Sequence, residues 1–132
     1  MIDFSNEIFN TVAKRLRSVF SGIQVMGEHI SAPSKFPTVT VDETRNIPTN
    51  LDSGKFGKYA AVTYRIQVFS NKTNGKRAEA RSIYNTVDTV MQELGLYAKT
   101  YTTTPTIYNS EIYCITATYE GVIGEDGTIY RG

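Results

Sequence analysis

The stretch YAAVTYRIQVFSNKTNGKRAEARSIYNTVDTVMQELG, residues 59–95, decides the fold because a strand pattern in it runs directly into a helix pattern. Apolar and aromatic side chains alternate over residues 59–69, which is the period of a half-buried strand. Apolar residues then recur at steps of three and four, which predicts an amphipathic helix over about residues 75–94. Gly95 is predicted to end this helix, since the position after a helix often needs a positive φ, which glycine adopts without strain. A strand and a helix joined by so short a turn must pack together to bury both apolar faces.

The rest of the chain supplies one more helix and several strands. A stripe of apolar residues predicts an amphipathic helix over about residues 4–20, and residues 96–122 contain two strand-like runs that predict a hairpin. Short alternating runs near residues 24 and 39 predict two further strands. The sequence therefore predicts an α+β fold: one small domain over residues 1–132, with a mostly antiparallel sheet of four to five strands and two amphipathic helices packed on one face.

Residues 44–58 have no hydrophobic period and are rich in turn-forming residues. A loop of about fifteen residues exceeds the common length of connections in compact domains, which indicates disorder or a role in contact. Its apolar residues Ile47, Leu51 and Phe56 favour contact.

Composition excludes some classes of protein. The 132 residues carry 14 basic and 13 acidic side chains, whereas a non-specific nucleic-acid binder has a clear basic excess. A single cysteine, Cys114, cannot form an internal disulfide, which favours a reducing compartment. The acidic start MIDFSNEIF does not resemble a signal peptide, and no apolar run is long enough to span a bilayer. We therefore expect a soluble protein that is not exported.

Residues able to carry catalysis are few. His29 is the only histidine, and no partner that would make it a general base lies near it in the sequence. Cys114 lies in an alternating strand, where a cysteine is more often a packing residue than a nucleophile. The run GKFGK, residues 54–58, is not a phosphate-binding loop, because it precedes a strand and lacks the ending of that motif. The adjacent acids Asp42 and Glu43 do not have the spacing of a metal site and are typical of a strand end. We therefore expect no enzymatic activity, no catalytic residues, no cofactor and no metal.

Tyrosine is the one unusual residue in the composition. Six of the nine tyrosines follow residue 95, and tyrosine is favoured both in strands and at protein interfaces. The composition leaves both explanations open.

Three motifs in a fixed order resemble the tail-terminator family of long-tailed bacteriophages and related particles, also called tail-completion or minor capsid proteins. They are VFSN at residues 68–71, VDTVMQELG at residues 87–95 and YEGVIGEDGTIYR at residues 119–131. The resemblance covers about the C-terminal two-thirds of the chain, and the N-terminal helix fits the family's layout. None of the motifs contains a catalytic group.

The resemblance implies a structural role in the virion, in a protein made in the bacterial host cytoplasm. Family members form a homo-oligomeric ring, in most cases hexameric, that binds the end of the tail tube, stops its polymerisation and presents the docking surface for the head–tail connector protein. The ring can also contact the tail sheath protein, DNA passes through it without specific binding, and no membrane is involved. We expect the 44–58 loop to reach a neighbouring subunit or the channel, through Arg45, Ile47, Leu51, Phe56 and Lys58.

Two other interpretations stay open. One is a different neck or head-completion connector ring protein. The other is a small nucleic-acid-binding or enzymatic α+β domain, for which the sequence offers one aromatic and basic pair on the same strand face, Phe69 and Arg65.

Overall fold

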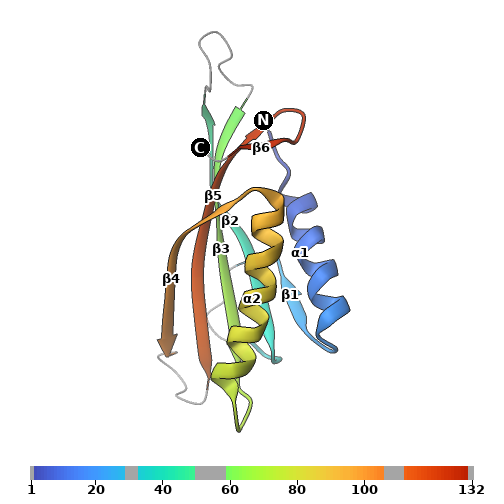
Figure 1. Ribbon diagram of the computed structural model, residues 1–132, viewed down its shortest axis with the longest axis vertical. Helices are drawn as coiled ribbons and strands as arrows, with labels where there is room; N and C mark the ends of the chain where they lie inside the picture. The colour runs from blue at the N-terminus through green and yellow to red at the C-terminus, as the bar shows by residue number, and fades with distance from the viewer. Residues whose placement is uncertain (1, 29–32, 50–58, 106–111, 131–132) are drawn as a thin grey trace.

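The computed structural model describes residues 2–28, 33–49, 59–105 and 112–130 (Figure 1). The elements in chain order are α1 (Ser5–Val19), β1 (Gln24–Met26), β2 (Thr38–Thr49), β3 (Tyr59–Ser70), α2 (Lys76–Leu94), β4 (Tyr97–Pro105), β5 (Tyr113–Gly124) and β6 (Ile129–Tyr130). They form a single sheet in the order β1-β2-β3-β5-β4, and the two-residue β6 pairs with β5. Only the β1–β2 pair is parallel among the described strands.

Both helices lie side by side on the same face of the sheet, and no described helix covers the opposite face (Figure 1). Their buried residues follow the predicted helical spacing: Ile8, Val12, Ala13 and Leu16 in α1, and Ala80, Ile83, Tyr84, Val87, Val90 and Met91 in α2. The predicted fold class, a mostly antiparallel α+β sheet with two amphipathic helices on one face, is confirmed.

The strand that the alternating pattern identified, β3, lies at the centre of the sheet. It pairs antiparallel with β2 on one side and with β5 on the other. Its buried positions under the helices are Ala60, Val62, Tyr64, Ile66 and Val68, which follow the period of two predicted over residues 59–69. The side chains between them face the helix-free side of the sheet.

The predicted loop over residues 44–58 is wrong in its first part. Strand β2 continues to Thr49, and residues from Arg45 to Thr49 pair with β3 after a bulge between Glu43 and Arg45. Pro48 is tolerated there because β1 pairs with β2 only as far as Thr40, so no described strand lies on the outer side of Pro48 and needs its missing N–H. Residues 50–58 lie outside the described part of the chain.

Gly95 ends α2 as predicted, and a side chain at this position would be costly. Its φ is 96°, and a Cβ added there would lie 3.3 Å from the carbonyl oxygen of Ile129. We expect Gly95→Ala to lower the free energy of unfolding by about 2 kcal/mol, since the left-handed conformation alone costs a residue with a Cβ about 1 kcal/mol or more. Gly75→Ala is the matched control, because it has the same φ of 96° and nothing within 4 Å of the added atom. If urea denaturation gives the same loss in the free energy of unfolding for both variants, the contact with Ile129 does not contribute to the cost of Gly95→Ala.

Candidate functional site

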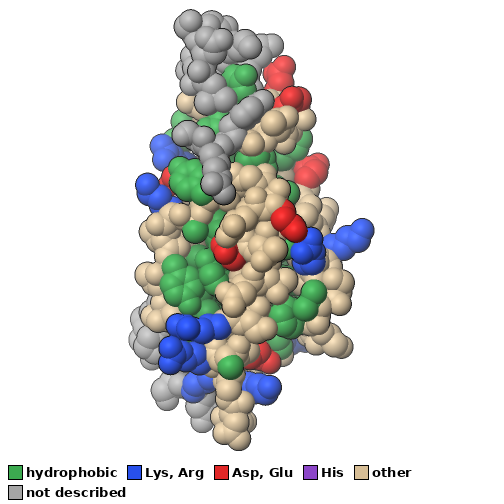
Figure 2. Space-filling view, viewed as in Figure 1, with side chains coloured by type: hydrophobic (Ala, Val, Ile, Leu, Met, Phe, Trp, Pro, Cys, Tyr) green, Lys and Arg blue, Asp and Glu red, His purple; other side chains and the backbone are tan. Residues whose placement is uncertain are grey.

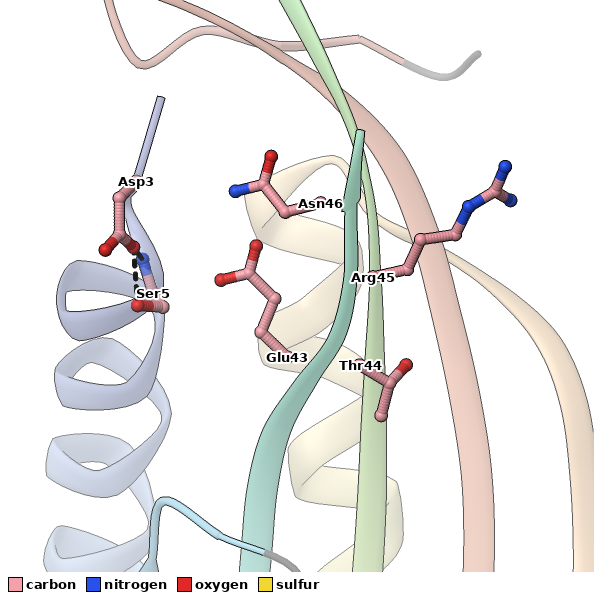
Figure 3. Close-up of a pocket in the computed structure, with 6 residues that line it drawn as sticks. All are labelled: Asp3, Ser5, Glu43, Thr44, Arg45 and Asn46. Carbon is pink, nitrogen blue, oxygen red and sulfur yellow. Dashed lines mark hydrogen bonds between the residues drawn. The ribbon is translucent and has the colours of Figure 1, made fainter. Parts of the chain in front are cut away.

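The helix-free face of the sheet carries two of the predicted contact residues. Arg45 pairs with Thr63 and Ile47 pairs with Ala61, and both partners lie on the face of β3 that points away from the helices. Figure 3 shows the Arg45 side chain pointing away from α1. Ile47 is 43% exposed, and Val19 and Tyr101 are the other exposed large hydrophobic residues in the described part of the chain. The other three predicted contact residues, Leu51, Phe56 and Lys58, lie outside the described residues.

This face also carries polar side chains that pair across neighbouring strands, although Nε of Arg65 is buried without a partner. Arg65 Nη2 donates to Asp42 Oδ2 at 2.9 Å, and the hydroxyl oxygens of Thr100 and Thr118 are 2.7 Å apart. The Arg65 guanidinium is therefore engaged by a carboxylate on the neighbouring strand. Phe69 is 1% exposed, so its ring is not available to stack on a base as a nucleic-acid reader would require.

Cys114 lies on the same face and is buried in a small apolar cluster with Phe69 and Ile112, against which Phe36 packs. Burial raises the pKa of its thiol, so the neutral form is favoured. A buried neutral thiol is a poor nucleophile, and its surroundings are those of a packing residue. His29 lies outside the described residues.

A polar hollow, which we call the α1–β2 niche, lies between the start of α1 and the middle of β2. It adjoins a second hollow of about 450 Å³ that Tyr64 lines together with Ser5 and Glu43. The niche itself is lined by six residues: Asp3, Ser5, Glu43, Thr44, Arg45 and Asn46. Figure 3 shows Glu43 and Asn46 pointing from β2 toward α1, while Arg45 points the other way. Two carboxylates thus approach one space from two elements.

The α1 side of the niche is held by local hydrogen bonds. Asp3 Oδ1 accepts from the Ser5 amide at 3.0 Å and from the Ser5 hydroxyl at 2.6 Å, and these bonds lower the pKa of Asp3. Asn46 Nδ2 donates to the Ile2 carbonyl at 2.8 Å and fixes the chain before α1 against β2. Asp3 is therefore a positioned, ionised carboxylate at neutral pH.

The β-sheet side of the niche has buried polar atoms that are poorly paired. Glu43 Oε1 and the Tyr64 hydroxyl are both buried and form no hydrogen bond of full geometry, although the two groups face each other closely enough for Glu43 to raise the pKa of Tyr64. Tyr64 as a whole is only 1% exposed. Burial raises the pKa of Glu43, and the carboxylates of Asp3 and Asp42 raise it further. Burial and the neighbouring Glu43 also raise the pKa of Tyr64, which keeps its hydroxyl protonated. Buried polar groups left in this way are destabilising unless something binds them.

The raised pKa of Glu43 makes stability depend on pH in a definite direction. The folded state binds the proton more tightly than the unfolded state, whose value is near 4.5, so stability falls as pH rises from 4.5 through the folded-state pKa. Glu43→Gln should remove this dependence, and the variant should be more stable than the wild type at neutral pH, with the difference shrinking toward pH 4.5. Urea denaturation midpoints across this range test the prediction, with Glu28→Gln at an exposed position as the control. A variant less stable than the wild type at neutral pH would contradict it.

Sequence reasoning missed the niche. It treated Asp42 and Glu43 as acids at a strand end, whereas β2 continues past them and Glu43 takes the inward position that follows Val39 and Val41. The available signal was this alternation, which puts a carboxylate where an apolar residue would be expected.

Within the described residues, no group of three or more His, Cys, Asp or Glu side chains is arranged to hold a metal ion.

No helix in the described part of the chain is long and apolar enough to cross a membrane. No family model matches the chain, and no curated protein matches it. Among solved structures, the chain is similar to the bacteriophage SPP1 gp17 protein, with 19% sequence identity, a TM-score of 0.39, and coverage of 86% of this chain and 89% of that chain. A bacteriophage protein is therefore a structural neighbour of this chain, at low structural overlap.

Proposed function

We propose that this protein is a non-enzymatic structural component of a bacteriophage tail, which forms a ring that caps the tail tube, ends its polymerisation and presents a surface to the head. The observation that carries the proposal is the exposure of Ile47 beside Arg45 on the helix-free face. A single exposed aliphatic side chain is common on protein surfaces, so what matters is its position beside Arg45, since arginine is enriched at protein interfaces. The ordered sequence motifs that resemble the tail-terminator family support the assignment to a phage tail.

Ring formation requires two different, complementary surfaces on each subunit. The described sheet ends on one side in the three-residue strand β1 and on the other in the nine-residue strand β4. These two edges differ in length, so each molecule presents two different edge surfaces to its neighbours. Two different edges on one subunit allow neighbouring subunits to associate head to tail around an axis.

The proposed partners are other copies of the chain in a hexamer, the tail tube protein, the head–tail connector protein and, in a contractile tail, the sheath protein. DNA passes through the ring without specific binding. The protein belongs to the virion and is made in the cytoplasm of the bacterial host.

The decisive experiment mixes the purified protein with its tail tube protein and images the tubes by negative-stain electron microscopy. We expect a ring of this protein at one tube end and a fixed tube length in its presence. Tubes that grow without limit and carry no added ring would overturn the proposal. A protein that instead copurifies with the portal side and ignores isolated tubes would be a different neck ring.

The contact role of Ile47 can be tested in the same assay. Ile47→Asp introduces a charge at an exposed site, so we expect the circular dichroism spectrum to be unchanged and the number of capped tubes to fall at least about tenfold. Val19→Asp is the matched control, because Val19 is also an exposed large hydrophobic residue, at 55%, but lies at the end of α1. Equal capping by both variants would remove Ile47 from the contact surface.

A further inference from the structure

The α1–β2 niche has the composition of a binding site for a basic side chain. Together with the adjoining hollow, it combines the ionised carboxylate of Asp3, the Glu43 carboxyl group with a buried Oε1, and the buried hydroxyl of Tyr64, neither of which forms a hydrogen bond of full geometry. Tyr64 is almost fully buried and lines the same hollow as Glu43. The acceptor oxygens of Glu43 and Tyr64 are buried, whereas those of Asp3 lie at the exposed edge of the hollow, and the charge of the site is negative.

A guanidinium group matches this set of acceptors. It is always charged, and its five N–H donors in a rigid fork can contact two carboxylates and a hydroxyl oxygen together. Hydrogen bonds from a guanidinium to carboxylates are also stronger than those between neutral groups. Arg45, the nearest arginine in the lining, does not supply the group, because its side chain points away from α1 (Figure 3).

The chain itself carries unpaired arginines at another place. Lys72, Arg77 and Arg81, which we call the α2 basic patch, are exposed, and their side chains form no ion pair with a described residue. Figure 2 shows Lys and Arg side chains gathered over the start of α2, at the lower end of the molecule. Cations in the first turn of a helix oppose its dipole, so the stability of α2 does not account for Arg77.

The niche and the α2 basic patch lie toward opposite ends of the molecule, because the start of α1 is at the upper end and the start of α2 is at the lower end (Figure 1). One molecule therefore cannot bring them together. In a pair of molecules, the niche of one can receive the patch of the other. One molecule then keeps a free patch and the other a free niche, which is the geometry of a head-to-tail contact. The formal net charge of +1 leaves little overall repulsion between copies.

We propose that the α1–β2 niche receives a guanidinium from the Arg77 and Arg81 pair of a second copy of this chain, in a head-to-tail contact between neighbouring subunits. This inference rests on the proposed ring function and names the contact that builds the ring. Arg77 and Arg81 are one helical turn apart on α2, so they share one exposed face and either can enter the niche.

A charge exchange tests this contact. Self-association is measured by sedimentation velocity, and by counting rings on tube ends, for Glu43→Gln, Glu43→Arg and the double variant Arg77→Glu/Arg81→Glu. Each should weaken association by about 30-fold or more, as expected when one partner of a desolvated charge pair is lost. Combining Glu43→Arg with the two arginine reversals should restore at least about a tenth of wild-type affinity. Association of the wild type should also weaken as salt concentration rises.

Control variants separate this contact from general effects of charge. Glu93→Gln and Lys14→Glu change exposed charges on α2 and α1 outside the niche and the patch, and should leave association within about twofold of the wild type. Glu43→Gln keeps the shape of the side chain and, as predicted above, should stabilise the monomer, so weaker association cannot be attributed to unfolding.

The results also separate this contact from the ring function itself. If rings cap tubes and Glu43→Gln associates as the wild type does, or the charge exchange gives no recovery, the contact proposed here is wrong and the ring function stands. If the wild type stays monomeric with and without tubes, both are overturned.

Discussion

Ile66→Ala should lower the free energy of unfolding by about 4 kcal/mol, within the range measured for removing a large aliphatic side chain from a rigid core. Ile66 is fully buried at the centre of β3 and pairs with Val41 on β2 and Ala117 on β5. It faces the helix layer, so the cavity would be enclosed by the sheet and the helices. Because a domain of this size is stable by only about 5–15 kcal/mol, the loss should be plain in urea or thermal denaturation.

The matched control for Ile66→Ala is Thr63→Ala in the same strand. Thr63 is half-buried on the helix-free face, so its truncation should cost less than about 1 kcal/mol. Equal losses in the two variants would mean that the helix-free face is packed as tightly as the core, which would contradict its assignment as a contact surface.

Tyr119→Phe should have the second largest effect, a loss of about 2–3 kcal/mol, because it breaks a buried hydrogen-bond network between α2 and β5. The Tyr119 hydroxyl donates to Asp88 Oδ1 at 2.5 Å and lies 2.7 Å from the Tyr84 hydroxyl, and Gln92 donates to the other oxygen of Asp88 at 2.7 Å. Burial and these hydrogen bonds raise the pKa of Tyr119, so its hydroxyl stays a donor at all ordinary pH values. Removing it leaves a carboxylate oxygen and a second tyrosine without their partner.

Tyr97→Phe is the control for this network. The Tyr97 hydroxyl donates to Glu120 Oε2 at 3.2 Å at a half-exposed position where water can replace it. Its loss should cost less than about 1 kcal/mol in the same urea titration. A similar cost for Tyr97→Phe and Tyr119→Phe would show that burial adds nothing to the network.

The number of tyrosines in the sequence does not predict which of them lie in the core and which on the surface. Their abundance left packing and interface roles open, and the structure divides them. Tyr64 and Tyr119 are buried beneath the helices, whereas Tyr101 is 42% exposed, with its ring centroid 5.0 Å from that of Tyr84. A residue count cannot make this division, because burial depends on which face of a strand each position takes.

The sequence alone determined the central strand, both helices and the stop at Gly95, because periods of two and of about 3.6 are properties of the local backbone and need no knowledge of distant residues. Only the tertiary structure decided that β2 continues through Arg45 to Thr49, and that Asp3, Glu43 and Tyr64 line two adjoining hollows. These residues come from three separate segments of the chain. They come together because of the register of strand pairing and the bulge between Glu43 and Arg45. Neither feature can be predicted from the local sequence pattern of a single segment.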